Sequence, residues 1–190
     1  YKVADKMFKH GANASTFADW WAYKYEVIDA IPHNAAIMNR VGVNVAINSD
    51  DAEMARRLNQ EAAKTVKYGG LSEEEAIRMV TINPAKMLRV DAYTGSLKAG
   101  KQADLVIWNG HPLSMYSKPL YTLVDGVVYF DHERDAAARQ ALQAERQRLI
   151  EKMAEARKNG KKTAKPALMI EPEWHCETLG DQGAHLHHTH

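Results

Sequence analysis

The run of residues 43–47, Val-Asn-Val-Ala-Ile, most restricts how this chain can fold, because its β-branched side chains stand between a glycine and the polar run 48–51. This is the pattern of a short strand between two breaks. Upstream, residues 2–10 have helical spacing, residues 12–17 read as another short buried strand, and residues 32–42 read as a helix. Helix, strand, helix, strand in this order is typical of parallel α/β architecture.

Helices are also predicted downstream of this strand. Apolar residues at every fourth position predict one helix over residues 51–66. Ser72 and Glu75 form the S-x-x-E pattern of a capping box, so a second helix is predicted to begin there. Asn83 and Pro84 predict a third start, with asparagine as the N-cap and proline at the first helical position.

The character of the chain changes after residue 90, where glycines separate short apolar runs. Three strands of a small β unit are predicted there, at 105–108, 120–124 and 127–130. Asp125-Gly126, between the last two runs, is a hairpin-turn pattern.

One charged helix is predicted over residues 133–158, with Ala138, Leu142, Leu149 and Met153 as its contact edge. A linker and a flexible Gly- and His-rich tail follow. The tail contains Trp174-His175-Cys176 and four later histidines, a composition able to chelate divalent metals. The predicted organisation therefore has four parts, at 1–90, 91–132, 133–158 and 159–190.

Composition excludes several classes of protein. With 25 Lys plus Arg against 24 Asp plus Glu, the formal charge is +1, which argues against a nucleic-acid surface. No stretch approaches the ~20 apolar residues that a membrane span needs. Cys176 is the only cysteine, so no internal disulfide can form. The first residues, from Tyr1, have no signal-peptide pattern, and we expect the chain to be the C-terminal part of a larger protein.

The run Asn48-Ser49-Asp50-Asp51 is the best candidate for chemistry, because functional residues of parallel α/β folds gather after the carboxyl ends of strands. A carboxylate there can bind a divalent metal or take a proton from a metal-bound water. Alternatively, Asp50 or Asp51 only caps the next helix, and each of the two could do one of these jobs. Asn48 and Asp51 are candidates for contact with substrate, with structural roles as the alternative.

Three sequence motifs that follow one another in a fixed order resemble those of a known family. Ser49-Asp50 follows a strand, Thr81-Ile82-Asn83-Pro84-Ala85 comes next, and a glycine-punctuated run from Gly95 to Ile107 reads G-S-L-x-x-G-x-x-A-D-L-V-I. In this order the motifs resemble the C-terminal part of metal-dependent amidohydrolases, and most of all the imidazolonepropionase-like branch. The resemblance covers roughly residues 1–135.

The resemblance implies the C-terminal part of a (β/α)8 TIM-type barrel plus part of a small β-sandwich. Residues 12–17 would then be strand seven and 43–47 strand eight. Asp50 would bind the metal, act as general base toward a metal-bound hydroxide, and later pass the proton to the leaving nitrogen. The implied cofactor is a divalent metal, zinc, as one or two ions.

The aromatic segment after the presumed seventh strand would lie over the active site of such a barrel. Trp20 and Trp21 could line a substrate pocket there, and Asp19 could contact a substrate amine. The alternative is that these rings pack between barrel helices.

The other metal ligands of such a family do not lie in this chain. The family needs an H-x-H pair after strand one and further ligands after strands four to six, whereas the H-x-H patterns here are at 185–187 and 188–190. We therefore expect this chain to hold one ligand of about five, to need the N-terminal part of the same protein, and to be inactive alone.

The expected function is hydrolysis of a carbon–nitrogen bond other than a protein peptide bond, in a small cyclic amide, amidine or dipeptide-like substrate. One alternative is deamination of a heterocycle on the same fold. Another is a non-catalytic binding or assembly module whose tail holds metal. A homo-oligomer and any cellular location remain open.

Overall fold

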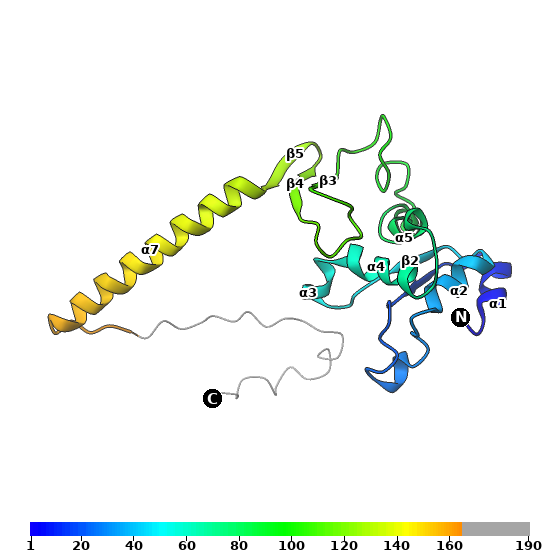
Figure 1. The fold of residues 1–190 in the computed structure, drawn as a ribbon, viewed down its shortest axis with the longest axis horizontal. Coiled ribbons are helices and arrows are strands. Elements are labelled where there is room, and N and C mark those ends of the chain that lie inside the picture. Colours follow the sequence, from blue (N-terminus) through cyan, green and yellow to red (C-terminus); the bar gives the residue numbers. More distant parts are fainter. Residues whose placement is uncertain (165–190) are drawn as a thin grey trace. The chain divides into compact units, whose positions relative to one another are not determined.

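The computed structural model describes residues 1–164, so the predicted metal-binding tail lies outside the described residues. The chain divides into two units, one of residues 1–139 and one that begins at Gln140. The helices and strands follow in this order (Figure 1): α1 (Ala4–His10), β1 (Ala14–Thr16), the 3-10 helix η1 (Tyr25–Val27), α2 (Asn34–Val41), β2 (Val45–Ile47), α3 (Ala52–Ala55), α4 (Leu58–Lys67), α5 (Glu73–Arg78), α6 (Ile82–Met87), β3 (Leu105–Trp108), β4 (Pro119–Val124), β5 (Val127–Asp131) and α7 (His132–Lys158).

A parallel strand pair lies at the centre of the first unit. β1 and β2 pair with Ala14 opposite Val45, Ser15 opposite Ala46 and Thr16 opposite Ile47. The connection between them contains α2, as parallel pairing requires a crossover. The predicted alternation of helices and strands and the α/β class are thereby confirmed, although each strand is shorter than its apolar run.

The hydrophobic core covers one face of this pair. Ala14, Val45 and Ile47 belong to a buried cluster with Met79 and with residues of α1 and α2. Helices α2, α4 and α6 contact β2, and the Ile47 N–H donates to the Met79 carbonyl over 3.1 Å. Side chains alternate along a strand, so Ser15 and Ala46 point to the other face.

The capping box is confirmed, but two other helix predictions are wrong. Ser72 and Glu75 bond reciprocally at the start of α5. Residues 51–66 form two helices, because Arg57 takes a non-helical φ of −134° and becomes the N-cap position of α4. Asn83 is no N-cap: α6 begins at Ile82, two residues before the predicted start, and the Asn83 amide donates to the Val45 carbonyl over 2.8 Å.

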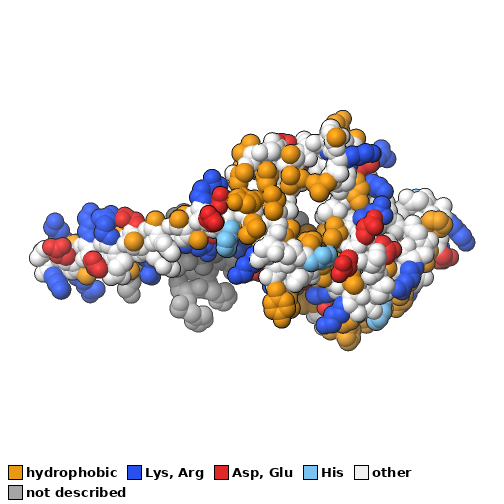
Figure 2. Space-filling model, turned by 45° about the horizontal axis from the view of Figure 1, so that its top comes forward, with side chains coloured by type: hydrophobic (Ala, Val, Ile, Leu, Met, Phe, Trp, Pro, Cys, Tyr) orange, Lys and Arg blue, Asp and Glu red, His pale blue; other side chains and the backbone are white. Residues whose placement is uncertain are grey.

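The predicted small β unit is an antiparallel sheet in the order β3-β4-β5. Asp125 and Gly126 both have positive φ, 49° and 79°, as a type I′ hairpin turn requires. No described residue after Ala85 is buried. Apolar side chains of this sheet are exposed, with Val127 at 59% and Tyr129 at 69%. Figure 2 shows apolar side chains gathered on the surface of the molecule.

Helix α7 has no buried residue, and Leu142, Leu149 and Met153 of the predicted contact edge are 69%, 49% and 39% exposed. Ion pairs between side chains three or four positions apart stabilise this helix. The nitrogen–oxygen distance is 2.7 Å both for Arg139 with Asp135 and for Arg148 with Glu145. Among the described helices, none combines the length and the apolar character that crossing a membrane requires.

Candidate functional site

The candidate site lies where β2 ends. The Asn48 N–H donates to the Thr16 carbonyl over 3.0 Å, which continues the ladder one residue past the strand. The Asn48 side-chain amide donates to the Ser15 hydroxyl over 2.7 Å. Backbone and side chain together fix Asn48 against β1.

Asp50 lies on a turn that leaves the strand. Its φ is 49°, in the left-handed region, which aspartate tolerates better than most residues. The side chain of Ser49 is buried and bonds to the Asp51 backbone, donating to its carbonyl over 3.0 Å. This anchoring leaves Asp50 exposed beyond the carboxyl end of β2. Non-glycine residues in this region often mark functional sites.

Asp51 takes the capping role. It is the N-cap of α3, and its carboxylate accepts the Met54 N–H over 2.7 Å. The sequence left open which of the two aspartates caps the helix. The structure assigns the cap to Asp51, which leaves the carboxylate of Asp50 outside that role.

Asp19 pairs with a lysine of α4. The Lys64 Nζ lies 2.9 Å from an oxygen of Asp19 and 2.9 Å from an oxygen of Glu61, which is buried. Burial lowers the pKa of Lys64, but the hydrogen bonds to both carboxylates outweigh it, and the pKa lies above its usual value. A contact of Asp19 with a substrate amine stays a prediction, and it would have to compete with Lys64.

The aromatic loop after β1 packs largely on itself. The ring of Trp20 stacks on Phe17 with a centroid distance of 4.5 Å, and Tyr23 meets it edge-on at 5.7 Å. Trp21 is half exposed. A role for Trp20 or Trp21 against substrate stays a prediction, and Trp21 is the more accessible of the two.

Two polar residues near the site are not identified from sequence. Asn34 is buried and its amide donates to the Thr16 hydroxyl over 2.8 Å, which ties α2 to the end of β1. Ser15 is the exposed residue of β1 and bonds Asn48. Both residues can be identified only once the strand register is known, because the residue that each one bonds is distant in the chain.

The described residues do not fit a catalytic metal ion by themselves. Catalytic zinc sites use three protein ligands, whereas no group of three or more His, Cys, Asp or Glu that could hold a metal occurs within residues 1–164. Asp50 supplies a suitable oxygen donor. The ligand set would have to be completed by residues beyond those described.

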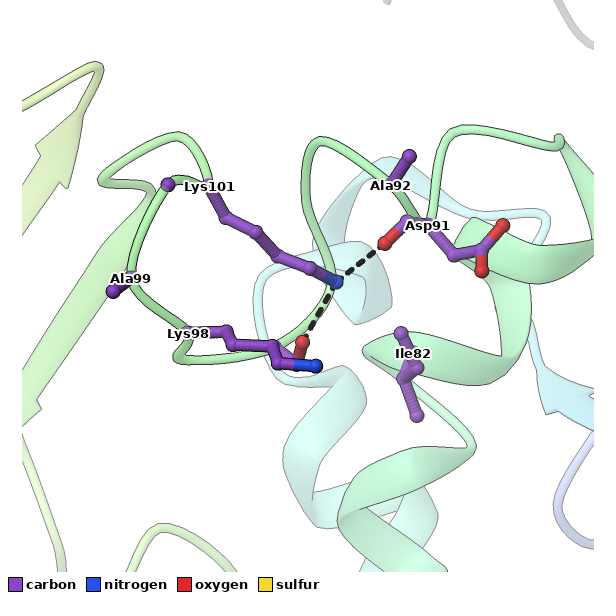
Figure 3. A pocket seen from close by; sticks show the side chains of 8 residues that line it. Ile82, Asp91, Ala92, Lys98, Ala99 and Lys101 are labelled. Atoms are coloured by element: carbon purple, nitrogen blue, oxygen red, sulfur yellow. Dashed lines mark hydrogen bonds between the residues drawn. The ribbon is translucent and has the colours of Figure 1, made fainter.

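An open pocket of about 520 Å³ lies elsewhere, beside α6 and the loop 91–101. Figure 3 shows Lys101 reaching across it to the Asp91 carbonyl. Lys101 also donates to the Thr94 carbonyl and the Ser96 hydroxyl, over 3.1 and 2.8 Å. Its three N–H groups are thus matched by three acceptors, and the pocket includes none of the candidate residues. Lys101 holds this loop together.

Parts of the chain are similar in sequence to known proteins. Residues 27–130 match the Amidohydrolase family. The amidohydrolase tasK of Hapsidospora irregularis is 34% identical over 116 residues, which cover 60% of this chain and 12% of that protein. An imidazolonepropionase of Picrophilus torridus is 35% identical over 98 residues, covering 47% of this chain and 25% of the relative. Deaminases are also among the relatives.

A solved structure shares the fold. An amidohydrolase from Thermotoga maritima superposes with a TM-score of 0.60 at 31% identity, over 70% of this chain and 35% of that one. The chain therefore spans a minor part of the length of each of these relatives.

Proposed function

The chain belongs to the amidohydrolase family, and from this premise we propose that it forms the part of a carbon–nitrogen hydrolase that supplies Asp50 to the active site. The supporting observation is the difference in position between the two aspartates that follow β2. Asp51 caps α3, and Asp50 lies exposed on a left-handed turn beyond the carboxyl end of β2, where functional residues of parallel α/β folds gather.

In the proposed reaction the carboxylate of Asp50 accepts a proton from the attacking water. It later gives this proton to the leaving nitrogen, so it ends the cycle as a carboxylate again. Proton transfer by a positioned side chain contributes typically 10²–10⁴-fold to a rate.

The rest of the site is proposed to come from other parts of the same protein. The chain covers 12% and 25% of two relatives, which leaves room for a complete (β/α)8 barrel, for the partner of a β-sandwich and for the other ligands of a divalent metal, zinc. One or two ions would be held, with Asp50 as one ligand. The chain alone would then be inactive.

The proposed substrate is a small cyclic amide, amidine or dipeptide-like molecule. Trp20, Trp21, Asp19, Asn48 and Asp51 are the candidates for contact with it. Deamination of a heterocycle is the second candidate, because deaminases are among the relatives. Both reactions replace a carbon–nitrogen bond using water.

The test compares two nearby carboxylates in the full-length protein. Asp50→Asn is expected to lower kcat/KM by 10²-fold or more, about the contribution of general acid–base catalysis. Glu53→Gln is the matched control, because Glu53 is an exposed carboxylate of α3, three positions further on, and pairs with the exposed Arg56. Equal activity in the two variants would overturn the role of Asp50. Release of ammonia separates deamination from ring opening.

The non-catalytic alternative has its own test. Metal content is measured in the full-length protein, in Asp50→Asn and in a variant lacking residues 174–190. The proposal expects metal loss in Asp50→Asn and none on tail deletion. Loss of metal and turnover only on tail deletion would favour a binding module with a metal-holding tail.

A further inference from the structure

We propose that the corner between α5 and α6, residues 79–83, closes the outer edge of β2, the edge away from β1, in place of a further strand. A further strand of the sheet would then join at the outer edge of β1. This inference rests on the barrel of the proposed function, and it adds a seam in the ring of strands beyond β2. It also gives the motif at 81–85 a role, because Asn83 holds the strand that Asp50 follows.

The strand register determines which backbone groups face each edge of β2. In a parallel ladder the N–H and C=O of one residue point to the same neighbour, and successive residues alternate between the two edges. The Asn48 N–H donates to the Thr16 carbonyl over 3.0 Å, so Asn48 faces β1. Val45 and Ile47 are three positions and one position before Asn48. Their backbone groups therefore point to the outer edge.

The α5–α6 corner bonds to both of these residues. The Ile47 N–H donates to the Met79 carbonyl over 3.1 Å. The Val45 carbonyl accepts an N–H of the Asn83 side-chain amide over 2.8 Å. One residue of a neighbouring parallel strand would bond these same two groups, the first with its C=O and the second with its N–H. The corner thus takes the place of that strand residue.

The corner is also packed into the core. Met79 and Val45 are both fully buried and belong to the same hydrophobic cluster. The Asn83 carbonyl accepts the side-chain amide of Asn44 over 3.2 Å, so Asn83 is bonded to two successive residues of the β2 segment. A strand could bond the outer edge of β2 only if Met79 left the core, and the burial of its side chain opposes that movement.

The outer edge of β1 differs from that of β2. By the same alternation, the N–H and C=O of Ser15 point away from β2, and within residues 1–164 this sheet contains only β1 and β2. Such backbone groups form a template for a further strand. The chain covers 12% and 25% of two relatives. The joining strand is therefore proposed to come from another part of the same protein.

The test measures amide hydrogen exchange at single-residue resolution in the full-length protein. Asn83→Leu keeps the branched shape of the side chain but cannot donate to the Val45 carbonyl. We expect it to speed exchange of the Ile47 N–H about tenfold relative to the Asn48 N–H, which is bonded to β1 instead. In the wild type we expect slow exchange of the Ser15 N–H, because the joining strand bonds at that edge.

Asn59→Leu is the matched control, because the Asn59 amide also donates to a main-chain carbonyl, that of Pro112, in a bond that involves no residue of β2. Its ratio of the Ile47 and Asn48 exchange rates should stay at the wild-type value. An unchanged ratio in Asn83→Leu would overturn the closed edge. Fast exchange of the Ser15 N–H in the wild type would overturn joining at β1.

A crystal structure of the full-length wild type decides the matter if Asn83→Leu does not fold. Met79 and Asn83 bonded to β2 as described would support the closed edge, whereas a strand bonded to the Val45 carbonyl and the Ile47 N–H would overturn it.

The seam and the hydrolase fail separately. Cleavage that depends on Asp50, with an exchange ratio unaffected by Asn83→Leu, would support the hydrolase and overturn the seam. A changed exchange ratio, without cleavage of any carbon–nitrogen substrate, would support the seam and overturn the hydrolase.

Discussion

The Nζ atom of Lys64 lies 2.9 Å from a carboxylate oxygen of Asp19. Through this contact α4 holds the loop that follows β1 and carries Trp20. Lys64 also neutralises Glu61, which is buried. A single lysine thus connects the helix after one strand of the parallel pair to the loop after the other.

Replacing Lys64 by methionine should destabilise the protein, because it leaves the buried Glu61 without its cation. We expect a loss of roughly 1–3 kcal/mol in the free energy of unfolding, measured by urea denaturation of the full-length protein. Tryptic cleavage at Lys24 should also become faster. Lys67→Met, an exposed position of the same helix, should change neither. Unchanged stability in Lys64→Met would show that the ion pair contributes nothing net.

The capping box predicts a pH dependence in the acid range. Hydrogen bonds from the Ser72 backbone and hydroxyl hold the pKa of Glu75 below its usual value. A carboxyl group with a lowered folded-state pKa stabilises above its unfolded pKa, and this stabilisation is lost as the pH falls through the folded pKa. Glu75→Gln should therefore lower the melting temperature at pH 7 and lower it less at pH 3. Glu74→Gln serves as control, and an equal effect of Glu75→Gln at both pH values would contradict the assignment.

A close approach between helices predicts the effect of a methyl group at Gly69. A Cβ there would lie 2.4 Å from the Cβ of Ala36 and 2.6 Å from the Thr65 carbonyl oxygen. Since Ala36 is fully buried, Gly69→Ala should cost about 1–3 kcal/mol through overpacking. Gly100 has a φ of +88° but open space around it. Gly100→Ala should therefore cost only about 1 kcal/mol, from backbone strain. The comparison is made by urea denaturation, and a smaller cost at Gly69 than at Gly100 would contradict the packing.

Exposed apolar residues predict the behaviour of the isolated 190-residue chain. Leu88, Leu97 and Tyr129 are 73%, 84% and 69% exposed. Apolar side chains gather on the face drawn in Figure 2, and an exposed apolar patch promotes association. We expect the chain to bind a hydrophobic dye and to self-associate in size-exclusion chromatography with light scattering. A monodisperse chain with a cooperative thermal transition would contradict this expectation.

Features that depend on neighbouring residues could be predicted from the sequence. The Ser72–Glu75 capping box and the Asp125–Gly126 turn were identified correctly, because each signal lies within a few positions. The start of α6 could not be. The amide of Asn83 is engaged by the Val45 carbonyl, 38 positions away, and local spacing contains no information about that bond.

The place of the candidate site could be predicted from the sequence, but the roles of its residues could not. The polar run after β2 marks its place, but sequence alone cannot separate Asp50 from Asp51, since either can cap a helix. The bond from Asp51 to the Met54 N–H separates them. Ser15 could not be identified, because its importance depends on which residue of β2 lies beside it.

The two sheets also differ in how they can form during folding. Val124 and Val127 pair across one tight turn, and hairpins of this kind close within about 1–10 μs. Ala14 and Val45 are 31 positions apart (45 minus 14) and meet only after α2 has crossed over. Pairings that close long loops form slowly. We therefore expect the antiparallel sheet to form before β1, which contains Ser15, pairs with β2, which Asn48 follows. The polar pair at the site would then be among the last contacts to form.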